Sequence, residues 1–448
     1  MCGNILIMTV PVFNYRINIG IRVPGTLVRF RHVSLLRAGY VREVEEGFCM
    51  QDVVIISSAT RANDRYESLV DMIDPNEFSV EFITSKFMHP TKQFRDLSKE
   101  QPEKLRCKVT YIDELGYKKN ISLRRIRSNF VLGRNVYNYL EQRKKPDLIF
   151  AVIPALEMAY HAARFASKHH VPFILDLRDL WPEAYRMVFD LPILRDLFFR
   201  PVARHANYVY SHSDAVVAVS DTFLKRAARN AKPGIPMEKV TLGTDLRLFE
   251  QYVGEHAVLR NDREIWIGYV GTLGRSYDIE HVIDALAILK KAGYGNLRFV
   301  VIGGGFLKER FAAYAEKKGV LCEFTGKLPY PEMAGRLAAC DIAVNPIVHR
   351  SAGSLINKVA DYAAAGLPVL NSQECDEYRE LVDRYRCGLN CRCEDAPDMA
   401  EKLKTLIDDP QLRKTMGANN RRLAAEMFDR RVEYPRIVEL FRRFRRGA

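Results

Sequence analysis

The chain has no run of apolar residues long enough to cross a bilayer as a helix. A spanning helix needs about 20 such residues, and the nearest candidate, LIFAVIPALEMAYHAA, is interrupted by Glu157. The N-terminal MCGNILIMTV lacks the basic region that precedes the apolar core of a secretory signal, so it resembles a first buried strand. We therefore expect a cytoplasmic protein that does not span a membrane.

The cysteines lack the spacing of a disulfide framework or of a zinc site. Nine of them are scattered through 448 residues, an odd number that favours a reducing compartment. Cys375, Cys387, Cys391 and Cys393 do not form the paired C-x2-C pattern of structural zinc. The chain also lacks helix-turn-helix, zinc-finger and RNP patterns. We expect no metal, no cofactor and no nucleic-acid partner.

What the chain does have is an excess of positive charge, formally +13 at neutral pH. Between Gly116 and Lys145 the one acid is Glu141, and the C-terminal RRFRRGA places arginines around Phe441 and Phe444. Such surfaces suit anionic lipid headgroups and phosphates, although a run of charge is equally the solvated face of an ordinary helix. Both interpretations stay open. The basic residues of the first run are Lys118, Lys119, Arg124, Arg125, Arg127, Arg134, Arg143, Lys144 and Lys145.

Apolar runs that end in glycine or small polar residues alternate with helical patterns along the whole chain. This alternation predicts parallel sheets covered by helices on both faces. We expect an α/β protein with two doubly wound, Rossmann-like domains facing a central cleft, where ligands bind at the carboxyl ends of the strands. The expected strands are 4–10, 52–58, 79–84, 107–113, 147–153, 172–177 and 215–220, then WIGYV, LRFVVI, VLCEFTG, DIAVNPI and LPVL.

One helix is marked at both ends. Ile279, Val282 and Leu286 share the spacing of a helix face after the GTLG turn. Asp278 is placed to cap its N-terminus and Gly293 to end it.

Eight motifs in this order resemble those of the family-4 glycosyltransferases of GT-B fold, especially the enzymes of bacterial surface polysaccharide biosynthesis. The resemblance is dense from about Asp147 onward and weak before it. The motifs are DLRDLWPEA, VAVSDTFLKR, KVTLGTDLRLF, GYVGTLG, VVIGGG, EFTGKLPYPEM, CDIAVNPI and NKVADYAAAGLPVL.

This resemblance implies a hexosyl or N-acetylhexosaminyl transferase that moves a sugar, with retention of configuration, from a nucleotide diphosphate donor, usually UDP-linked. The acceptor would be a glycan or lipid-linked saccharide, such as a polyprenyl diphosphate-linked sugar, in pathways such as lipopolysaccharide synthesis. We expect an acceptor-side domain over residues 1–250, a donor-binding domain over 251–425, and a basic C-terminal helix over 426–448 that returns to the first domain. The basic charge makes peripheral attachment to the inner face of an anionic membrane part of this expectation.

Departure of a diphosphate requires groups that stabilise negative charge, such as backbone N–H groups at turns and cationic side chains. The turn at Gly271, Thr272 and Gly274, followed by Arg275, meets this requirement. So does the start of the next candidate helix at Ser354 and Leu355, with Lys358 one turn further on.

The resemblance assigns two more donor contacts. Asp361, before the YAAAG run, matches the acid that binds the donor ribose, and Gly326 and Lys327 match the loop that contacts the base. The alternatives are an i, i+3 salt pair of Asp361 with Lys358 on a surface helix and a strand-ending turn at Gly326.

Three departures from the family pattern concern the donor site. The first acid of the usual E-x7-E pair is replaced by Gly353, and the second acid is an aspartate. Many members also have Arg and Lys where this chain has Thr272 and Tyr277, so Arg275 would be a relocated substitute. The glycine run 303–305 is weaker evidence for a donor-binding loop, since glycines after a buried strand also permit close packing.

On the acceptor side, the catalytic candidates are Asp176, Arg178 and Asp179, at the end of the FILDL strand. A carboxylate there could accept the acceptor hydroxyl proton, and Arg178 could hold a diphosphate. The alternative is that Arg178 and Asp179 pair to fix the turn. His161 lies on an expected helix, so we interpret it as a surface or packing residue rather than a catalytic base.

Two other functions fit the same sequence. A GT-B-like nucleotide-sugar epimerase would share fold and donor but need no acceptor. A non-catalytic nucleotide-binding scaffold is suggested by the missing glutamate at Gly353.

Overall fold

The computed structural model describes residues 20–23, 26–29, 50–58, 65–97, 106–120, 122–180, 192–260, 263–351 and 354–445, with side chains of 20–29 and 192–199 left aside. Residues 1–50 form a unit of their own, and Gln51–Ala448 form a second one. Within the first unit, β1 (Gly20–Val23) and β2 (Thr26–Arg29) pair as an antiparallel hairpin. The strand expected at residues 4–10 lies outside the described residues.

The second unit begins with a seven-stranded parallel sheet, here called the first sheet, whose order is β11-β10-β9-β8-β3-β4-β7. The chain thus builds outward from β3 in one direction and then, from β8, in the other, as in a doubly wound fold. Most of its strands coincide with expected ones, whereas the edge strand β11 was not predicted. The strands are β3 (Gln51–Ile56), β4 (Phe78–Ser85), β7 (Lys108–Ile112), β8 (Leu148–Ile153), β9 (Phe173–Leu177), β10 (Ala215–Ala218) and β11 (Met237–Lys239).

The second sheet has six parallel strands in the order β14-β13-β12-β15-β16-β17 and repeats this winding. Its reversal of direction lies between β12 and β15. The short edge strand β17 is an addition to the sequence prediction. The strands are β12 (Ile265–Val270), β13 (Leu297–Ile302), β14 (Cys322–Gly326), β15 (Ile342–Asn345), β16 (Val369–Asn371) and β17 (Gly388–Asn390).

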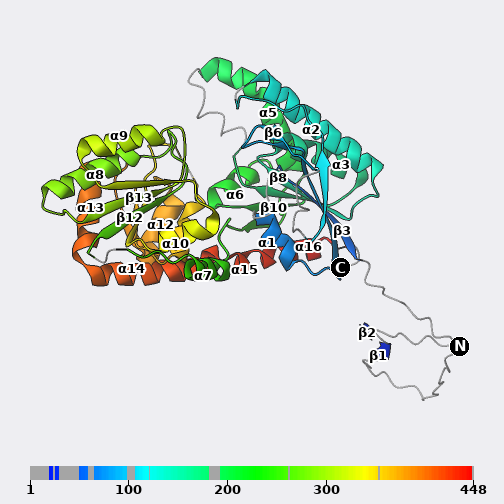
Figure 1. Cartoon of the computed structure of the whole chain (residues 1–448). Coiled ribbons are helices and arrows are strands. Elements are labelled where there is room, and N and C mark those ends of the chain that lie inside the picture. Colours follow the sequence, from blue (N-terminus) through cyan, green and yellow to red (C-terminus); the bar gives the residue numbers. More distant parts are fainter. Residues whose placement is uncertain are drawn as a thin grey trace, which may run out of the picture. The chain divides into compact units, whose positions relative to one another are not determined.

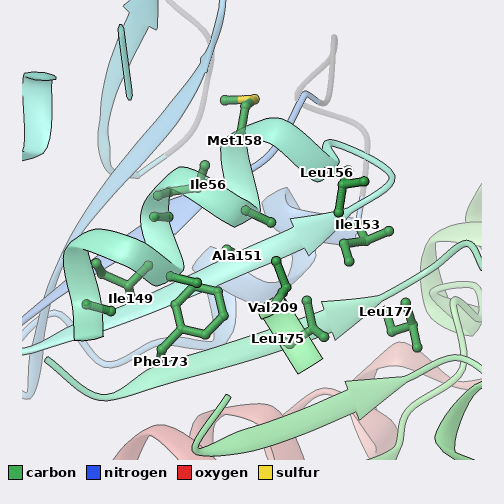
Figure 2. Packing of buried hydrophobic residues seen from close by; sticks show 14 of the residues in the cluster. Ile56, Ile149, Ala151, Ile153, Leu156, Met158, Phe173, Leu175, Leu177 and Val209 are labelled. Carbon is green, nitrogen blue, oxygen red and sulfur yellow. The ribbon is translucent and has the colours of Figure 1, made fainter. Parts of the chain in front are cut away.

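Helices cover both faces of the first sheet because its strands are apolar on both sides. Figure 2 shows one face, where alternate residues of β8 (Ile149, Ala151, Ile153) and β9 (Phe173, Leu175, Leu177) pack with Leu156 and Met158 of α3 and with Val209 of α5. The helices on this face are α2 (Leu123–Gln142), α3 (Leu156–His169), α5 (Pro192–His212) and α6 (Asp221–Ala228). The other face is covered by α1 (Arg65–Met72) and α16 (Pro435–Arg443), and β5 (Phe87–Met88) and β6 (Gln93–Phe94) form a separate hairpin.

The second sheet is covered in the same way. One face carries α8 (Ile279–Lys291), α9 (Lys308–Lys318) and α13 (Ala396–Asp408). The other carries α7 (Leu246–Glu255), α10 (Tyr330–Ala338), α11 (Lys358–Ala364), α12 (Asp376–Tyr385), α14 (Pro410–Leu423) and the π-helix η1 (Ala424–Phe428). The chain then passes through α15 (Arg430–Glu433) to α16, which packs against the first sheet (Figure 1). No helix among the described residues combines the length and apolar character needed to span a membrane.

The helix ends show which local signals were correct. The Asp278 carboxylate accepts a hydrogen bond from the N–H of His281, so it caps α8, and Gly293 follows the helix with a φ of +98°. By contrast, α11 begins at Lys358 and not at Ser354, so that expectation was wrong. Ser354 and Leu355 instead belong to the non-helical segment before α11.

Candidate active site

A cleft of about 860 Å³ lies between the two sheets, at the carboxyl ends of their strands. From the first sheet it is lined by Ser85, the last residue of β4, and by the residues that directly follow β3, β8 and β9, namely Ser57, Pro154 and Arg178. From the second sheet it is lined by Gly271, directly after β12. β3 and β8, like β12 and its neighbour β15, flank the point where the strand order reverses, which is where open α/β sheets bind ligands.

Lys358 is the most unusual charged group of the cleft. Its side chain is buried, with Nζ 3.1 Å from the Tyr269 hydroxyl and 3.8 Å from the centre of the Tyr277 ring. Within the described part of the chain no carboxylate lies at salt-bridge distance from Nζ. Burial lowers the pKa of Lys358 well below its ordinary value. The described neighbours of this amine are aromatic rings and a hydroxyl group, none of which carries a negative charge. A negatively charged ligand would therefore stabilise the ammonium form.

The turn after β12 is fastened to the loop after β13. The N–H of Gly271 donates to the carbonyl of Ile302 at 2.9 Å, and the N–H of Leu273 donates to Gly304 at 2.9 Å. These two N–H groups therefore hold the turn and do not face a ligand. A Cβ on Gly303 would lie 1.8 Å from the Gly271 carbonyl oxygen, so the glycine run serves this close approach.

Gly271 also makes room for Lys358. A Cβ at this position would lie 2.6 Å from Lys358 Nζ, and the backbone φ is +146°. The glycine after β12 therefore lets the buried amine reach the turn, and Thr272, exposed beside it, lines the cleft.

Asp361 lies one turn after Lys358 but in a different environment. Its Oδ1 accepts a hydrogen bond of 2.7 Å from the Tyr330 hydroxyl, which in turn lies 2.5 Å from the Thr244 hydroxyl. Burial raises the pKa of Asp361 to about 6, against the opposing effects of Tyr330 and Arg430. The described structure contains no ion pair between Asp361 and Lys358, so the surface salt pair considered from the sequence does not form.

The three candidates after β9 divide into two groups. Arg178 and Asp179 line the cleft. Protein around Asp179 raises the pKa of its carboxyl by burial, although Arg178 acts in the opposite direction. Asp176 is fully buried, lies 3.6 Å from Arg65 and accepts a hydrogen bond of 2.9 Å from the Tyr66 hydroxyl. Asp176 does not line the cleft, whereas the sequence had placed it there as a catalytic candidate.

Several other expected donor contacts lie away from the cleft. Ser354 and Leu355 do line it, together with Gly271, Thr272, Lys358 and Asp361. Gly274, Arg275, Gly326 and Lys327 are not among its lining residues. Arg275 is exposed to solvent, and Gly326 pairs with Gly303 at the end of β14. Gly353 lies outside the described residues.

The first-sheet side of the cleft contains a polar group that the sequence did not indicate. Ser128 donates a hydrogen bond of 2.5 Å to Glu114, and Ser85 also donates to this carboxylate. Burial raises the pKa of Glu114, with both serines opposing the shift. His89 lies 2.5 Å from the Tyr117 hydroxyl, and burial lowers the pKa of His89 to about 4. No motif marks these residues, because loops and strands distant in the sequence bring them together.

The cysteine cluster serves packing. Cys375 and Cys387 are buried among the apolar side chains on one face of the second sheet, and Cys391 lies on the other face. Among the residues that the structure describes, no group of His, Cys, Asp or Glu side chains is placed to hold a metal ion.

Comparison with known proteins agrees with this architecture. Residues 255–423 match the family model of the glycosyl transferases group 1. The probable glycosyltransferase WbjE of Pseudomonas aeruginosa is 25% identical over 254 residues, which cover 53% of this chain and 59% of that protein. The matched region spans less than two thirds of the curated relatives.

Solved structures extend the similarity to the whole fold. Sucrose-phosphate synthase from Thermosynechococcus elongatus has a TM-score of 0.69 at 16% identity, covering 88% of this chain and 98% of that one. Anabaena HepE in complex with UDP and glucose has a TM-score of 0.62 at 16% identity, covering 88% of this chain and 100% of that one. The protein therefore has the GT-B fold, as predicted, and residues 255–423 are similar to the glycosyl transferases of group 1.

Proposed function

We propose that the protein is a retaining family-4 glycosyltransferase, which moves a hexosyl or N-acetylhexosaminyl group from a UDP-sugar to a glycan or lipid-linked saccharide in surface polysaccharide synthesis. The observation that carries the proposal is the cleft between the two sheets, where Lys358 is buried without a described carboxylate partner. Support for a uridine nucleotide comes from HepE, whose structure contains UDP and glucose.

Lys358 has the chemistry required by a leaving diphosphate. Burial favours its neutral form in the free protein, and an arriving diphosphate restores the charged form by placing negative charge nearby. The resulting ammonium stabilises the charge that develops on the diphosphate when the glycosidic bond breaks. Thr272, Ser354 and Leu355 flank this position and supply backbone and hydroxyl contacts. The proposal requires no metal, so EDTA should leave turnover unchanged.

Asp361 is assigned to the donor ribose. Its carboxylate is held by Tyr330 and is charged above about pH 6, so it can accept hydrogen bonds from two ribose hydroxyls. On the opposite wall, Arg178 and Asp179 remain the groups proposed to meet the acceptor. Gly326 and Lys327 would reach the base only if the loop after β14 moves toward the cleft.

The test is release of nucleoside diphosphate from a panel of UDP-, GDP- and ADP-sugars, with and without a lipid-linked saccharide. We expect UDP release that depends on the acceptor and a product with the donor's anomeric configuration by NMR. Lys358→Ala should lower turnover about 100-fold, the scale for losing one charge-stabilising group. Lys317→Ala, an exposed lysine of α9, is the matched control.

Other outcomes point elsewhere. Isomerised sugar nucleotide without an acceptor would favour an epimerase, and UDP binding without turnover would favour a scaffold. Equal turnover of Lys358→Ala and the control would show that the phosphate site is misplaced.

A further inference from the structure

The first turns of α2 expose a stripe of apolar side chains. Leu123 is 76% exposed, and Ile126 and Phe130 are each 48% exposed. Spacings of three and four residues place the three on one side of the helix. Leu132, Val136 and Leu140 form the buried side of α2. The stripe therefore contributes little to the core of the first sheet and presents apolar surface to solvent.

A neighbouring loop extends the stripe. Leu115 and Phe94 are 40% and 52% exposed. The N–H of Gly116 donates to Ser128 of α2 at 2.9 Å. A Cβ on Gly116 would lie 2.9 Å from the Phe94 ring, so β6, the loop and α2 are in close contact. We call the surface formed by Phe94, Leu115, Leu123, Ile126 and Phe130 the apolar patch.

The charge on the α2 side of the apolar patch has one sign. The sequence contains no Asp or Glu from Leu115 to Leu140, and the acid before it, Glu114, accepts hydrogen bonds from Ser85 and Ser128. The cations beside the patch are exposed, and none has a carboxylate at salt-bridge distance among the described residues. They are Lys118, Lys119, Arg124 and Arg127.

The other basic segments do not share this character. Arg143 pairs with Asp52 at 2.8 Å and with Glu81 at 3.0 Å. At the C-terminus, Phe441 is fully buried and Arg442 pairs with Glu77 at 2.9 Å. In the C-terminal run, Phe441 and Arg442 are therefore engaged within the fold, whereas the start of α2 combines exposed apolar side chains with cations that have no described carboxylate partner. That combination is the one that binds the interface of an anionic bilayer.

The apolar patch also borders the cleft, because Arg125, Ile126 and Asn129 line it. We propose that the apolar patch and its cations dock the protein on an anionic lipid bilayer, with the cleft opening at the membrane surface. This inference deepens the proposed function by naming the surface that brings the cleft to a lipid-linked acceptor. Only this role of the surface rests on the proposed function; binding to the bilayer does not.

The test is flotation of the full chain with phosphatidylcholine vesicles, with and without phosphatidylglycerol, at low salt. We expect flotation with the anionic vesicles alone, weakened by added salt. Leu123→Ser combined with Phe130→Ser should lower the bound fraction at least about tenfold, given the free energy of burying each apolar group. Leu321→Ser combined with Phe306→Ser changes two exposed residues of the same types elsewhere and should float like the wild type.

A second pair of double variants tests charge, and each of the two variants removes two positive charges. Lys118→Gln with Arg127→Gln should weaken flotation about tenfold, whereas Lys144→Gln with Lys145→Gln, just beyond the far end of α2, should not. Circular dichroism checks that each variant is folded. Absence of flotation at low salt, or equal loss in test and control pairs, would overturn the inference. So would a concentration-dependent dimer that Leu123→Ser with Phe130→Ser abolishes, since the patch would then be a protein interface. UDP release from the donor in the presence of a soluble acceptor is measured separately, so its failure would concern the proposed function alone.

Discussion

Burial opposes the charge of Lys358 and of Asp361 in α11, and Asp361 offers a measurable consequence. Its pKa of about 6 in the folded protein exceeds the ordinary value of 3.8. The folded state therefore binds the proton more tightly, and stability falls as pH rises from about 4 to about 6. Above that window the ionised carboxylate lowers the free energy of unfolding, a cost that fits the ribose-binding role proposed for Asp361.

We expect Asp361→Asn to raise the free energy of unfolding at pH 7.5 by about 1–3 kcal/mol. The gain should vanish at about pH 3, below both pKa values, where Asp361 is protonated in the folded and the unfolded state. Urea denaturation at the two pH values measures it. A variant that is less stable than the wild type at pH 7.5 would contradict the assignment of a destabilising buried charge.

The two carboxylates after β9 should respond differently to the same substitution. Asp176→Asn weakens a buried pair with Arg65, so we expect a loss of about 3–5 kcal/mol in the free energy of unfolding. Asp179→Asn lies in the open cleft and should change it by less than about 0.5 kcal/mol, while lowering transfer to the acceptor. Denaturation and turnover of both variants are compared. Full turnover in Asp179→Asn would remove this carboxylate from the proposed acceptor site.

Among the elements, the loops after β12 and β13 pack so closely that their backbones leave no room for a side chain at two glycines, Gly303 and Gly305. A Cβ on Gly305 would lie 2.2 Å from the Leu273 carbonyl oxygen. Gly305→Ala should therefore lower the free energy of unfolding by about 1–3 kcal/mol, the usual cost of overpacking, and should weaken UDP binding by moving the turn that carries Thr272. Gly295→Ala is the control, because no atom lies within 4 Å of its added Cβ. Equal stability of the two variants would mean that the loops can separate freely.

Short sequence patterns predicted the features that are determined by the residues of the segment itself. The Asp278 cap and the continuous apolar runs of β8 and β9 belong to this kind, because a cap acts within one helix turn and burial on both faces requires apolar residues along the whole strand. The start of α11 was misplaced because the segment at Ser354 is fixed from outside: its carbonyl accepts a hydrogen bond of 2.7 Å from Gln373, which follows β16. No pattern around Ser354 could reveal that contact.

At the scale of the whole molecule, one contact joins the two sheets beside the cleft. Lys239 of β11 lies 2.6 Å from Asp221 of α6 and 3.1 Å from Glu377 of α12. Glu377 also accepts a hydrogen bond of 3.2 Å from the N–H of Asp221. An element of the second-sheet half thus caps a helix of the first-sheet half.

Glu377→Gln should loosen this contact and lower the free energy of unfolding by about 1–3 kcal/mol, the range for hydrogen bonds to charged groups. We also expect a broader distribution of distances between labels placed on the two halves, measured by double electron–electron resonance. Glu380→Gln, exposed on the same helix, is the control. An unchanged distribution would show that the halves are held by other contacts.

The sequence predicted the fold better than the site. Parallel sheets follow from repeated apolar strands, and motif order pointed to the cleft residues Lys358, Asp361 and Arg178. Asp176 was expected beside Arg178 and Asp179 but lies outside the cleft lining, and nothing in the FILDL run reveals that Arg65, far away in sequence, pairs with it. Tyr277 was noted as the replacement of a lysine, but its contact with Lys358 required the folded chain.

The most direct test of the account is a thermal-shift titration with UDP, GDP, ADP and CMP, because a ligand that binds the folded state alone raises its stability by RT ln(1 + [L]/Kd). We expect a shift with UDP that is strongly reduced in Lys358→Ala and Asp361→Ala and retained in Lys317→Ala. No shift with any nucleotide, or an equal UDP shift in all of the variants, would contradict a donor site built on Lys358 and Asp361.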